Sequence, residues 1–70
     1  QQISNIKKLH LENCKINDDK IQVLRNCNFN KLKILNLSVN RIGEKGVKYL
    51  IDCKQFDKLE ILYLSWNNIG

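Results

Sequence analysis

The chain has little of what most catalytic, cofactor and membrane sites require. His10 is its one histidine, and no serine or cysteine is spaced as a partner for it in nucleophilic catalysis. Its three glycines, Gly43, Gly46 and Gly70, fit no phosphate-binding loop, and the metal-site spacing Cys-x-x-Cys is absent. No apolar run approaches the roughly 20 residues of a membrane helix. We therefore expect a protein that is not an enzyme, with no cofactor, no metal site and no membrane segment.

The charge is unbalanced, but it is spread along the chain. A net charge of +5 is typical of proteins that bind nucleic acid or membrane surfaces. The twelve Lys and Arg residues are scattered, however, with no run longer than Lys7–Lys8. We interpret them as a solvated surface. The acidic residues fall at expected helix starts, loops and turns, where capping and solvation explain them.

The most informative feature of the sequence is an internal repeat. The spacing apolar-x-x-Leu-x-Leu-x-x-(Asn/Cys)-x-Ile begins at Ile6, Leu32 and Leu59, so the periods are 26 and 27 residues. Apolar positions between these motifs correspond in the same way. The corresponding pairs are Ile21 with Val47, Leu24 with Leu50, Cys27 with Cys53, and Phe29 with Phe56.

Each unit predicts a short strand followed by a helix. Residues 8–11 alternate polar and apolar, as a half-buried strand does, and residues 34–37 are the corresponding strand of the second unit. The side chains of 17–19 suit a helix N-terminus. A second helix is expected over 44–53, with an inner face of Val47, Leu50 and Ile51. Gly46 inside it costs about 1 kcal/mol relative to Ala, so we expect that helix to be short or to start late.

The chain resembles the leucine-rich repeat family, whose signature it matches at every fixed position. The units are similar to the ribonuclease-inhibitor-like class. The run 14–18 with Leu24-x-x-Cys27 also resembles the cysteine-containing repeats of F-box substrate receptors. The resemblance implies an α/β fold, a leucine-rich repeat solenoid. Strands about 4.8 Å apart and helices about 8–10 Å apart make a curved horseshoe segment, with parallel strands on the concave face and helices on the convex face.

The repeat boundaries place the whole sequence in one leucine-rich repeat segment. A repeat tail covers 1–5, full repeats cover 6–31 and 32–58, and a partial repeat covers 59–70. Neither end carries the polar cap that a stacked array needs. We expect an internal piece of a longer solenoid, with flanking repeats of the same parent chain.

The three cysteines are expected to be structural. Cys14 occupies the position of Asn40 and Asn67, where the family's side chain bonds the turn backbone. Cys27 and Cys53 lie near helix ends and are expected to face inward. Helix spacing of about 8–10 Å exceeds the roughly 7 Å that a disulfide spans. An odd number of buried thiols fits a reducing compartment, so we expect an intracellular protein, cytoplasmic, cytoskeletal or nuclear.

The residues between the repeat leucines face the concave side. In successive units they form four rows: Lys8, Ile34, Ile61; His10, Asn36, Tyr63; Glu12, Ser38, Ser65; and Asn13, Val39, Trp66. The second and third units are apolar and aromatic there, which is the composition of an interface hot spot. The competing interpretation is β-propensity alone. The predicted partner-binding residues are Lys8, His10, Ile34, Asn36, Val39, Ile61, Tyr63 and Trp66.

These observations predict a protein–protein interaction scaffold that binds its partner on the concave strand face. The resemblance also allows a substrate receptor or regulatory subunit of an enzyme complex, either F-box ubiquitin-ligase-like or GTPase-activator-like, a sensor-type receptor, or a cytoskeletal scaffold. Nucleic-acid binding is a third class, with Tyr63 and Trp66 as stacking platforms. It requires basic residues among the aromatics, and only Lys8 lies on the predicted rows.

Overall fold

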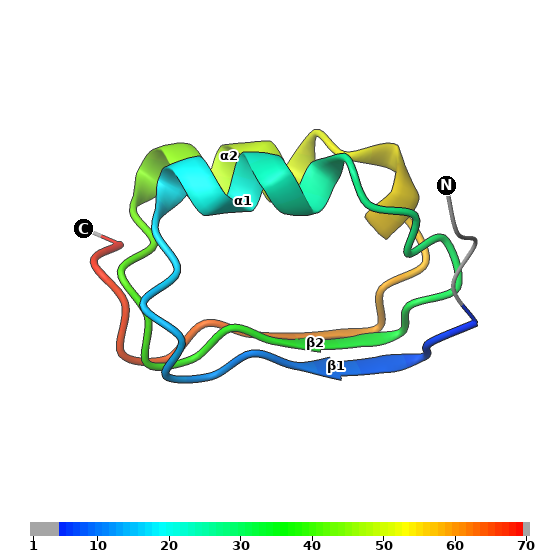
Figure 1. Ribbon diagram of the computed structural model, residues 1–70, viewed down its shortest axis with the longest axis horizontal. Helices are drawn as coiled ribbons and strands as arrows, with labels where there is room; N and C mark the ends of the chain where they lie inside the picture. Colours follow the sequence, from blue (N-terminus) through cyan, green and yellow to red (C-terminus); the bar gives the residue numbers. More distant parts are fainter. Residues whose placement is uncertain (1–4, 70) are drawn as a thin grey trace.

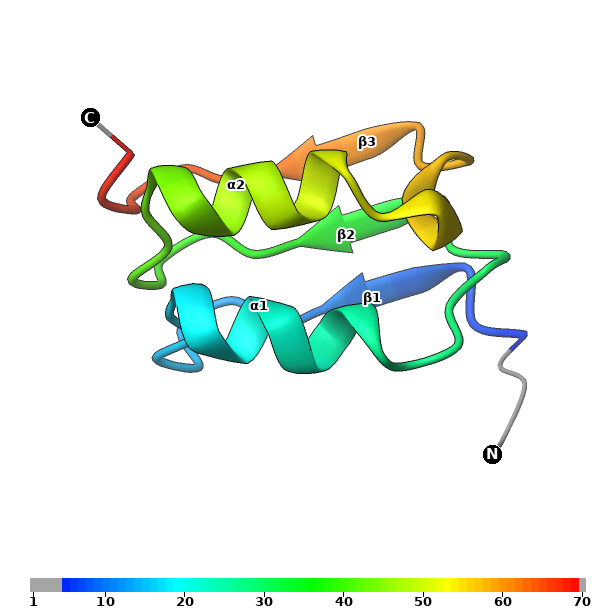
Figure 2. The ribbon, with the colours of Figure 1, turned by 90° about the horizontal axis from the view of Figure 1, so that it is seen from above.

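The computed structural model describes residues 5–69, which form two layers (Figure 1). Three parallel strands make an open sheet in the order β1-β2-β3, and the helices cover one of its faces. Seen from above, the strands lie side by side and the two α-helices run next to each other (Figure 2). The elements are β1 (Lys8–His10), α1 (Asp18–Arg25), β2 (Ile34–Asn36), α2 (Glu44–Ile51), the 3-10 helix η1 (Lys54–Phe56) and β3 (Ile61–Tyr63).

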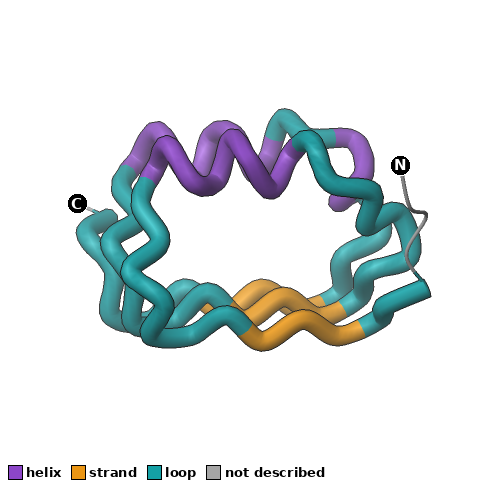
Figure 3. Tube along the Cα trace, viewed as in Figure 1, coloured by secondary structure: helices purple, strands orange, loops and turns teal. Residues whose placement is uncertain are grey.

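The strand register confirms the repeat. Leu35 pairs with Leu9 on one side and with Leu62 on the other, so the same signature position meets in all three strands. Each strand has three residues, one fewer than predicted, but the hydrogen bonding continues past it. The Leu11 N–H donates to the Asn36 carbonyl at 2.8 Å, and the Leu37 N–H donates to the Tyr63 carbonyl at 2.9 Å. Loops at both ends return the chain between the layers (Figure 3).

The core lies between the sheet and the helices and centres on the middle repeat. Burial is complete for Ile21, Leu32, Leu35, Leu37 and Ile42. Four of these five belong to the middle repeat, which within residues 5–69 has a neighbouring unit on each side. Stacking of repeats, rather than packing within one unit, therefore supplies the buried apolar area.

Helix α1 begins as the sequence predicted. The Asn17 side chain accepts a hydrogen bond from the Lys20 N–H at 3.0 Å and so satisfies one of the free donors of the first turn. Ile21 is fully buried, and Leu24 packs against the core at the next turn. The helix ends at Arg25, with Asn26 as its C-cap.

Helix α2 differs from the prediction in its extent and in its inner face. It ends at Ile51, and Cys53 instead precedes η1. The expected inward position of Ile51 is wrong, because its side chain is 72% exposed. The buried residues of α2 are Gly46 and Leu50, four apart on one helix face, and Ile51 lies about 100° around the helix from Leu50.

Of the two outcomes expected from Gly46, a short helix is observed and a late start is not, since α2 begins at Glu44 and ends at Ile51. The glycine is required by the neighbouring repeat. A Cβ at this position would lie 2.6 Å from Asp18 Oδ1 and 2.7 Å from Ile42 Cγ2. The same Asp18 oxygen accepts hydrogen bonds from the Gly43 N–H at 2.7 Å and the Gly46 N–H at 3.1 Å. A carboxylate of the first repeat thus caps the helix of the second.

A second contact between repeats involves Gln55, at the opposite end of the helices. Its Oε1 accepts from the Phe29 N–H at 2.7 Å, and its Nε2 donates to the carbonyls of Leu24 and Arg25 at 3.0 and 3.1 Å. One amide therefore holds the end of α1 and the loop that follows it.

No helix within residues 5–69 is long and apolar enough to cross a membrane.

All three cysteines are free thiols, and they differ in exposure. Cys53 is buried and Cys27 is half-buried near the end of α1, as expected for inward-facing residues. The expectation that all three thiols are buried is wrong for Cys14, which is exposed. Its sulfur lies 3.4 Å from the Glu12 carbonyl, within its own turn.

Candidate functional site

The outer face of the sheet brings the predicted strand residues into two rows. Lys8, Ile34 and Ile61 are register partners, as are His10, Asn36 and Tyr63. The first-strand side chains are polar and exposed, whereas Ile61 and Tyr63 on β3 are large, apolar or aromatic, and exposed. Ile34 and Asn36 on β2 are half-buried.

Two of the polar residues on this face have local partners. His10 Nδ1 lies 3.9 Å from Glu12 Oε1, and both side chains are largely exposed. Asn36 Oδ1 accepts from the Ser38 N–H at 3.1 Å, so this amide supports the turn after β2. The Asn36 side chain therefore has a structural role beside any role in binding.

The remaining two predicted residues, Val39 and Trp66, lie beyond the strands. With Asn13 they form what we call the left-handed row, because φ is 57° at Asn13, 59° at Val39 and 61° at Trp66. This backbone conformation suits Asn but is a genuine outlier for a β-branched or bulky residue. Val39 is 45% exposed and Trp66 is 83% exposed. β-propensity cannot account for apolar side chains at these two positions, since neither residue is in a strand.

An asparagine ladder holds these turns in place. Asn40 Oδ1 accepts from the Cys14 and Ile16 N–H groups at 3.0 and 2.9 Å, and its Nδ2 donates to the Leu11 and Leu37 carbonyls at 3.0 and 2.9 Å. The same amide also reaches the Ser38 carbonyl at 3.2 Å.

Asn67 repeats the pattern one unit later. Its Oδ1 accepts from the Ile42 N–H at 2.9 Å, and its Nδ2 donates to the Leu37 carbonyl at 2.9 Å. Each asparagine thus bonds both its own turn and the turn of the preceding unit. This is the turn-bonding role expected for the position that Cys14 occupies in the first unit.

Sequence reasoning missed two cations beside the left-handed row. Lys15 and Arg41 line a recess of about 220 Å³ between the first and second turns, which we call the turn recess. Its other lining residues are Asn13, Val39 and Asn40. The signal was present in the repeat alignment, where Lys15 and Arg41 share the column after the Cys/Asn position.

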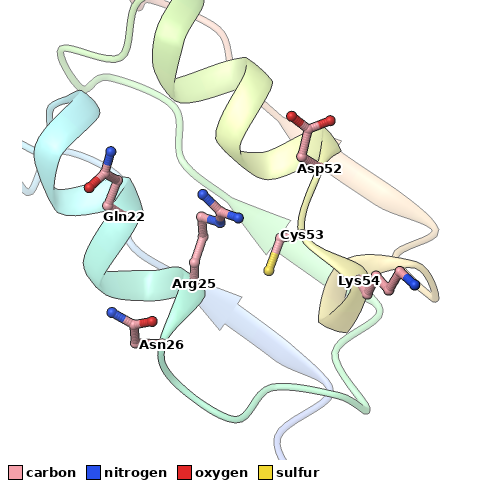
Figure 4. A pocket seen from close by; sticks show the side chains of 6 residues that line it. All are labelled: Gln22, Arg25, Asn26, Asp52, Cys53 and Lys54. Carbon is pink, nitrogen blue, oxygen red and sulfur yellow. The ribbon is translucent and has the colours of Figure 1, made fainter.

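A larger and polar recess of about 600 Å³ lies on the helix side, between the ends of α1 and α2 (Figure 4). Its lining residues are Gln22, Arg25, Asn26, Asp52, Cys53 and Lys54. Figure 4 shows the Cys53 sulfur turned toward the space between the helices and the Lys54 ammonium turned away from it. The Arg25 guanidinium lies over the Tyr49 ring, 5.7 Å from its centroid. None of the predicted site residues lies here.

The described part of the chain offers no cluster of three or more His, Cys, Asp or Glu side chains that could hold a metal ion. The arrangement on the strand side is instead a surface for contact, with exposed apolar and aromatic groups and three cations, Lys8, Lys15 and Arg41. Its chemistry is burial of apolar area together with charge pairing.

Comparison with known families agrees with the repeat pattern. Family models described as leucine-rich repeat match residues 5–27, 30–50 and 58–70. No solved structure was found to match the chain. The models describe the repeat in general, and the ribonuclease-inhibitor-like subclass stays a prediction. Leucine-rich repeat domains generally mediate protein–protein interaction and are typically non-enzymatic. With three units in register and the signature at every fixed position, the chain belongs to the leucine-rich repeat family.

Proposed function

We propose that the chain binds a protein partner on the strand side, through a surface we call the binding face. Its apolar residues are Ile34, Val39, Ile61, Tyr63 and Trp66, and its polar rim includes Lys8, His10 and Asn36. Trp and Tyr beside a polar rim are the residue types that dominate interface energetics. The partner would cover the exposed Trp66 side chain.

The observation that carries this proposal is the conformation of Val39 and Trp66. Each holds a left-handed backbone at a cost of about 1–2 kcal/mol, which Asn or Gly at the same position would reduce. Each also exposes its apolar side chain to solvent. Strained residues persist where the surrounding structure enforces them, and they cluster at functional sites.

The helix side also has exposed apolar residues, but their backbone is not left-handed. Val23 on α1 and Ile51 on α2 are exposed. They are single residues on two different helices, both with helical backbone. Scattered exposed apolar side chains are common on protein surfaces and need no functional explanation. These two residues provide a matched control.

The test is quantitative co-isolation of partners from native extract with two double variants. Val39→Asn/Trp66→Asn removes the apolar groups and eases the backbone strain, so we expect this variant to stay folded. Val23→Gln/Ile51→Gln removes the same number of exposed apolar residues from the helix side. We expect specific proteins to be lost with the first variant and retained with the second.

Either of two results would contradict the proposal. An unchanged partner list with Val39→Asn/Trp66→Asn would show that the binding face recognises nothing in that extract. Loss of partners with Val23→Gln/Ile51→Gln alone would assign recognition to the helix side. Thermal melts of all variants would be compared first, so that only folded proteins are scored.

We also propose that a further repeat of the parent chain covers the β3 side of the stack. Leu62 occupies the position of Leu35, yet it is 38% exposed whereas Leu35 is fully buried. Beside it lies a recess of about 250 Å³ with an apolar wall formed by Leu50, Phe56 and Leu59. A repeat stacked on β3 would bury Leu62 and the half-buried Leu59, as the third unit covers the second.

Appending an idealised leucine-rich repeat after Gly70 tests this second proposal. We expect higher thermal stability and a change in the effect of Leu62→Asp, from mild in the present chain to severe in the extended one. Leu35→Asp, which buries the charge in both chains, is the control. An appended repeat that leaves the stability and the effect of Leu62→Asp unchanged would contradict it.

Two further assignments are proposals of the same kind. We propose that the chain contributes binding and no catalysis of its own, in keeping with the typical role of its family. We also propose an intracellular location, because three free thiols, one of them exposed, suit a reducing compartment. Trapping the thiols in cells with an alkylating reagent tests the latter, and a disulfide-linked form of the chain would contradict it.

A further inference from the structure

The turn recess offers a ligand both an apolar contact and a charged contact. Val39 contributes an apolar wall, and Lys15 and Arg41 contribute two cations. The Val39 N–H donates to the Ser65 carbonyl at 2.8 Å, which holds the turn bearing Trp66 directly beside it. A ligand in the recess would therefore meet charge on one side and exposed apolar surface on the other.

The backbone beneath these cations is held in place. The Arg41 N–H donates to the Ile16 carbonyl at 2.8 Å, and Asn40 binds the N–H groups on both sides of Lys15. The two cations therefore extend from fixed backbone positions in adjacent repeats. A preorganised pair loses less freedom on binding than two side chains on mobile loops.

Neither cation is neutralised within the described chain. Over residues 5–69 the ion pairs are His10 with Glu12 and Lys33 with Glu60. Arg25, the other arginine of the chain, already lies over an aromatic ring. Arg41 has no such partner in that range, so its planar guanidinium remains available for a bidentate contact with a carboxylate.

We infer that the turn recess binds a carboxylate side chain of an acidic peptide segment, while an adjacent apolar side chain of that segment packs on Val39 and Trp66. This inference rests on the proposed function and specifies the chemistry of the partner. It also fits the net charge of +5, which favours association with an acidic surface.

The same cations could contact phosphates, but the surroundings favour a peptide. Affinity for nucleic acid grows with the number of phosphates that are neutralised, and the recess supplies two cations. The neighbouring strand rows add one further cation, Lys8, and otherwise continue with the apolar and aromatic side chains of Ile34, Ile61 and Tyr63. Those side chains suit the apolar residues of a peptide.

The experiment uses the full chain and its single tryptophan as the reporter. Trp66 is so exposed that a ligand covering it should shift its fluorescence emission to shorter wavelength. The probes are short tryptophan-free peptides in which Asp and Glu flank Leu or Phe, their Asn and Gln isosteres, and a uridine oligonucleotide. Each is titrated at low and at high salt.

We expect the acidic peptides to bind roughly tenfold or more tightly than their neutral isosteres at low salt, since charge-assisted contacts are the strong ones. Lys15→Gln/Arg41→Gln should abolish that preference. Lys45→Gln/Lys48→Gln removes the same charge from exposed positions of α2 and should retain it. Salt at about 500 mM should reduce the preference by screening.

Equal binding of acidic and neutral peptides, or no response from any peptide at about 1 mM, would overturn the inference. Tighter binding of the oligonucleotide, lost with Lys15→Gln/Arg41→Gln, would overturn it in favour of nucleic acid. The proposed function fails separately. In one outcome, co-isolated partners depend on Val39 and Trp66 and yet persist with Lys15→Gln/Arg41→Gln. That result would support partner binding on the binding face and contradict carboxylate binding in the turn recess.

Discussion

At the scale of the residue, one repeat position carries three different amino acids in one backbone conformation. Asn13, Val39 and Trp66 all have φ near 60°. Asn tolerates this region because its short polar side chain can bond locally, whereas Val and Trp crowd the following carbonyl. The ladder residues Asn40 and Asn67 hold the turns from the next position, so the conformation persists with unfavourable side chains.

Exchanging the residues of this row should change stability in opposite directions. Val39→Asn should raise the free energy of unfolding by about 1 kcal/mol, and Asn13→Val should lower it by about the same amount. Urea unfolding followed by circular dichroism measures both. A loss of stability with Val39→Asn would mean that packing of the valine outweighs the backbone strain.

At the scale of the element, α2 is shaped by its neighbour more than by its own sequence. Gly43 is the N-cap of α2 and has no side chain to cap the helix, and Asp18 of α1 supplies the missing acceptor. The space that this carboxylate occupies lies against Gly46, where a side chain would collide with it. A residue that intrinsic propensity disfavours is therefore the one that fits.

Gly46→Ala should destabilise the protein although alanine is the best helix former. Overpacking of this kind costs about 1–3 kcal/mol, against the roughly 1 kcal/mol that propensity returns. The measurement is thermal unfolding by circular dichroism. Lys45→Ala, at an exposed position of the same helix, is the control and should be nearly neutral.

Asp18 provides a further check on this contact. Asp18→Ala should itself lower stability, since it leaves the Gly43 and Gly46 N–H groups without their acceptor. In that background Gly46→Ala should cost less, leaving the collision with Ile42. Additive effects of the two substitutions would argue against a shared contact.

At the scale of the whole molecule, stability comes from stacking in register. Leu37 is fully buried in the core, whereas the adjacent Ser38 is half-buried. Neighbouring residues of an extended strand point to opposite faces, so a shift of one residue would exchange their environments.

Leu37→Asp should therefore unfold the chain by placing an unpaired charge in the core, whereas Ser38→Asp should be nearly silent. Thermal melts of the two variants measure the difference. Equal losses in both would contradict the register, and with it the assignment of the rows on the binding face.

Much of this architecture could be predicted because the same pattern of apolar residues occurs three times in the sequence. The Leu35 and Leu37 positions, the helix that starts after Asn17, and the strand rows all follow from periodicity, which local sequence records directly. The predicted burial of Ile51 and Cys14 is wrong, because local sequence does not record how exposed a side chain is. Both are apolar enough to suggest burial, but exposure depends on how the helix turns and on which neighbouring unit is present.

The repeat alignment places Lys15 and Arg41 in one column, but it does not show that these two cations line a recess with Val39. Lys15 and Arg41 look like solvated surface charges when the chain is read along its length. They meet Val39 only because the parallel register brings one turn beside the next.

The sequence by itself determined the repeat, the strand-then-helix order of each unit and the choice of which leucines face inward, because these depend on spacing along the chain. Only the tertiary structure decided the left-handed backbone of Val39 and Trp66, the capping of α2 by Asp18 and the pairing of the two cations. Each of these depends on contacts between repeats, and the atoms that meet there are about 26 residues apart in sequence.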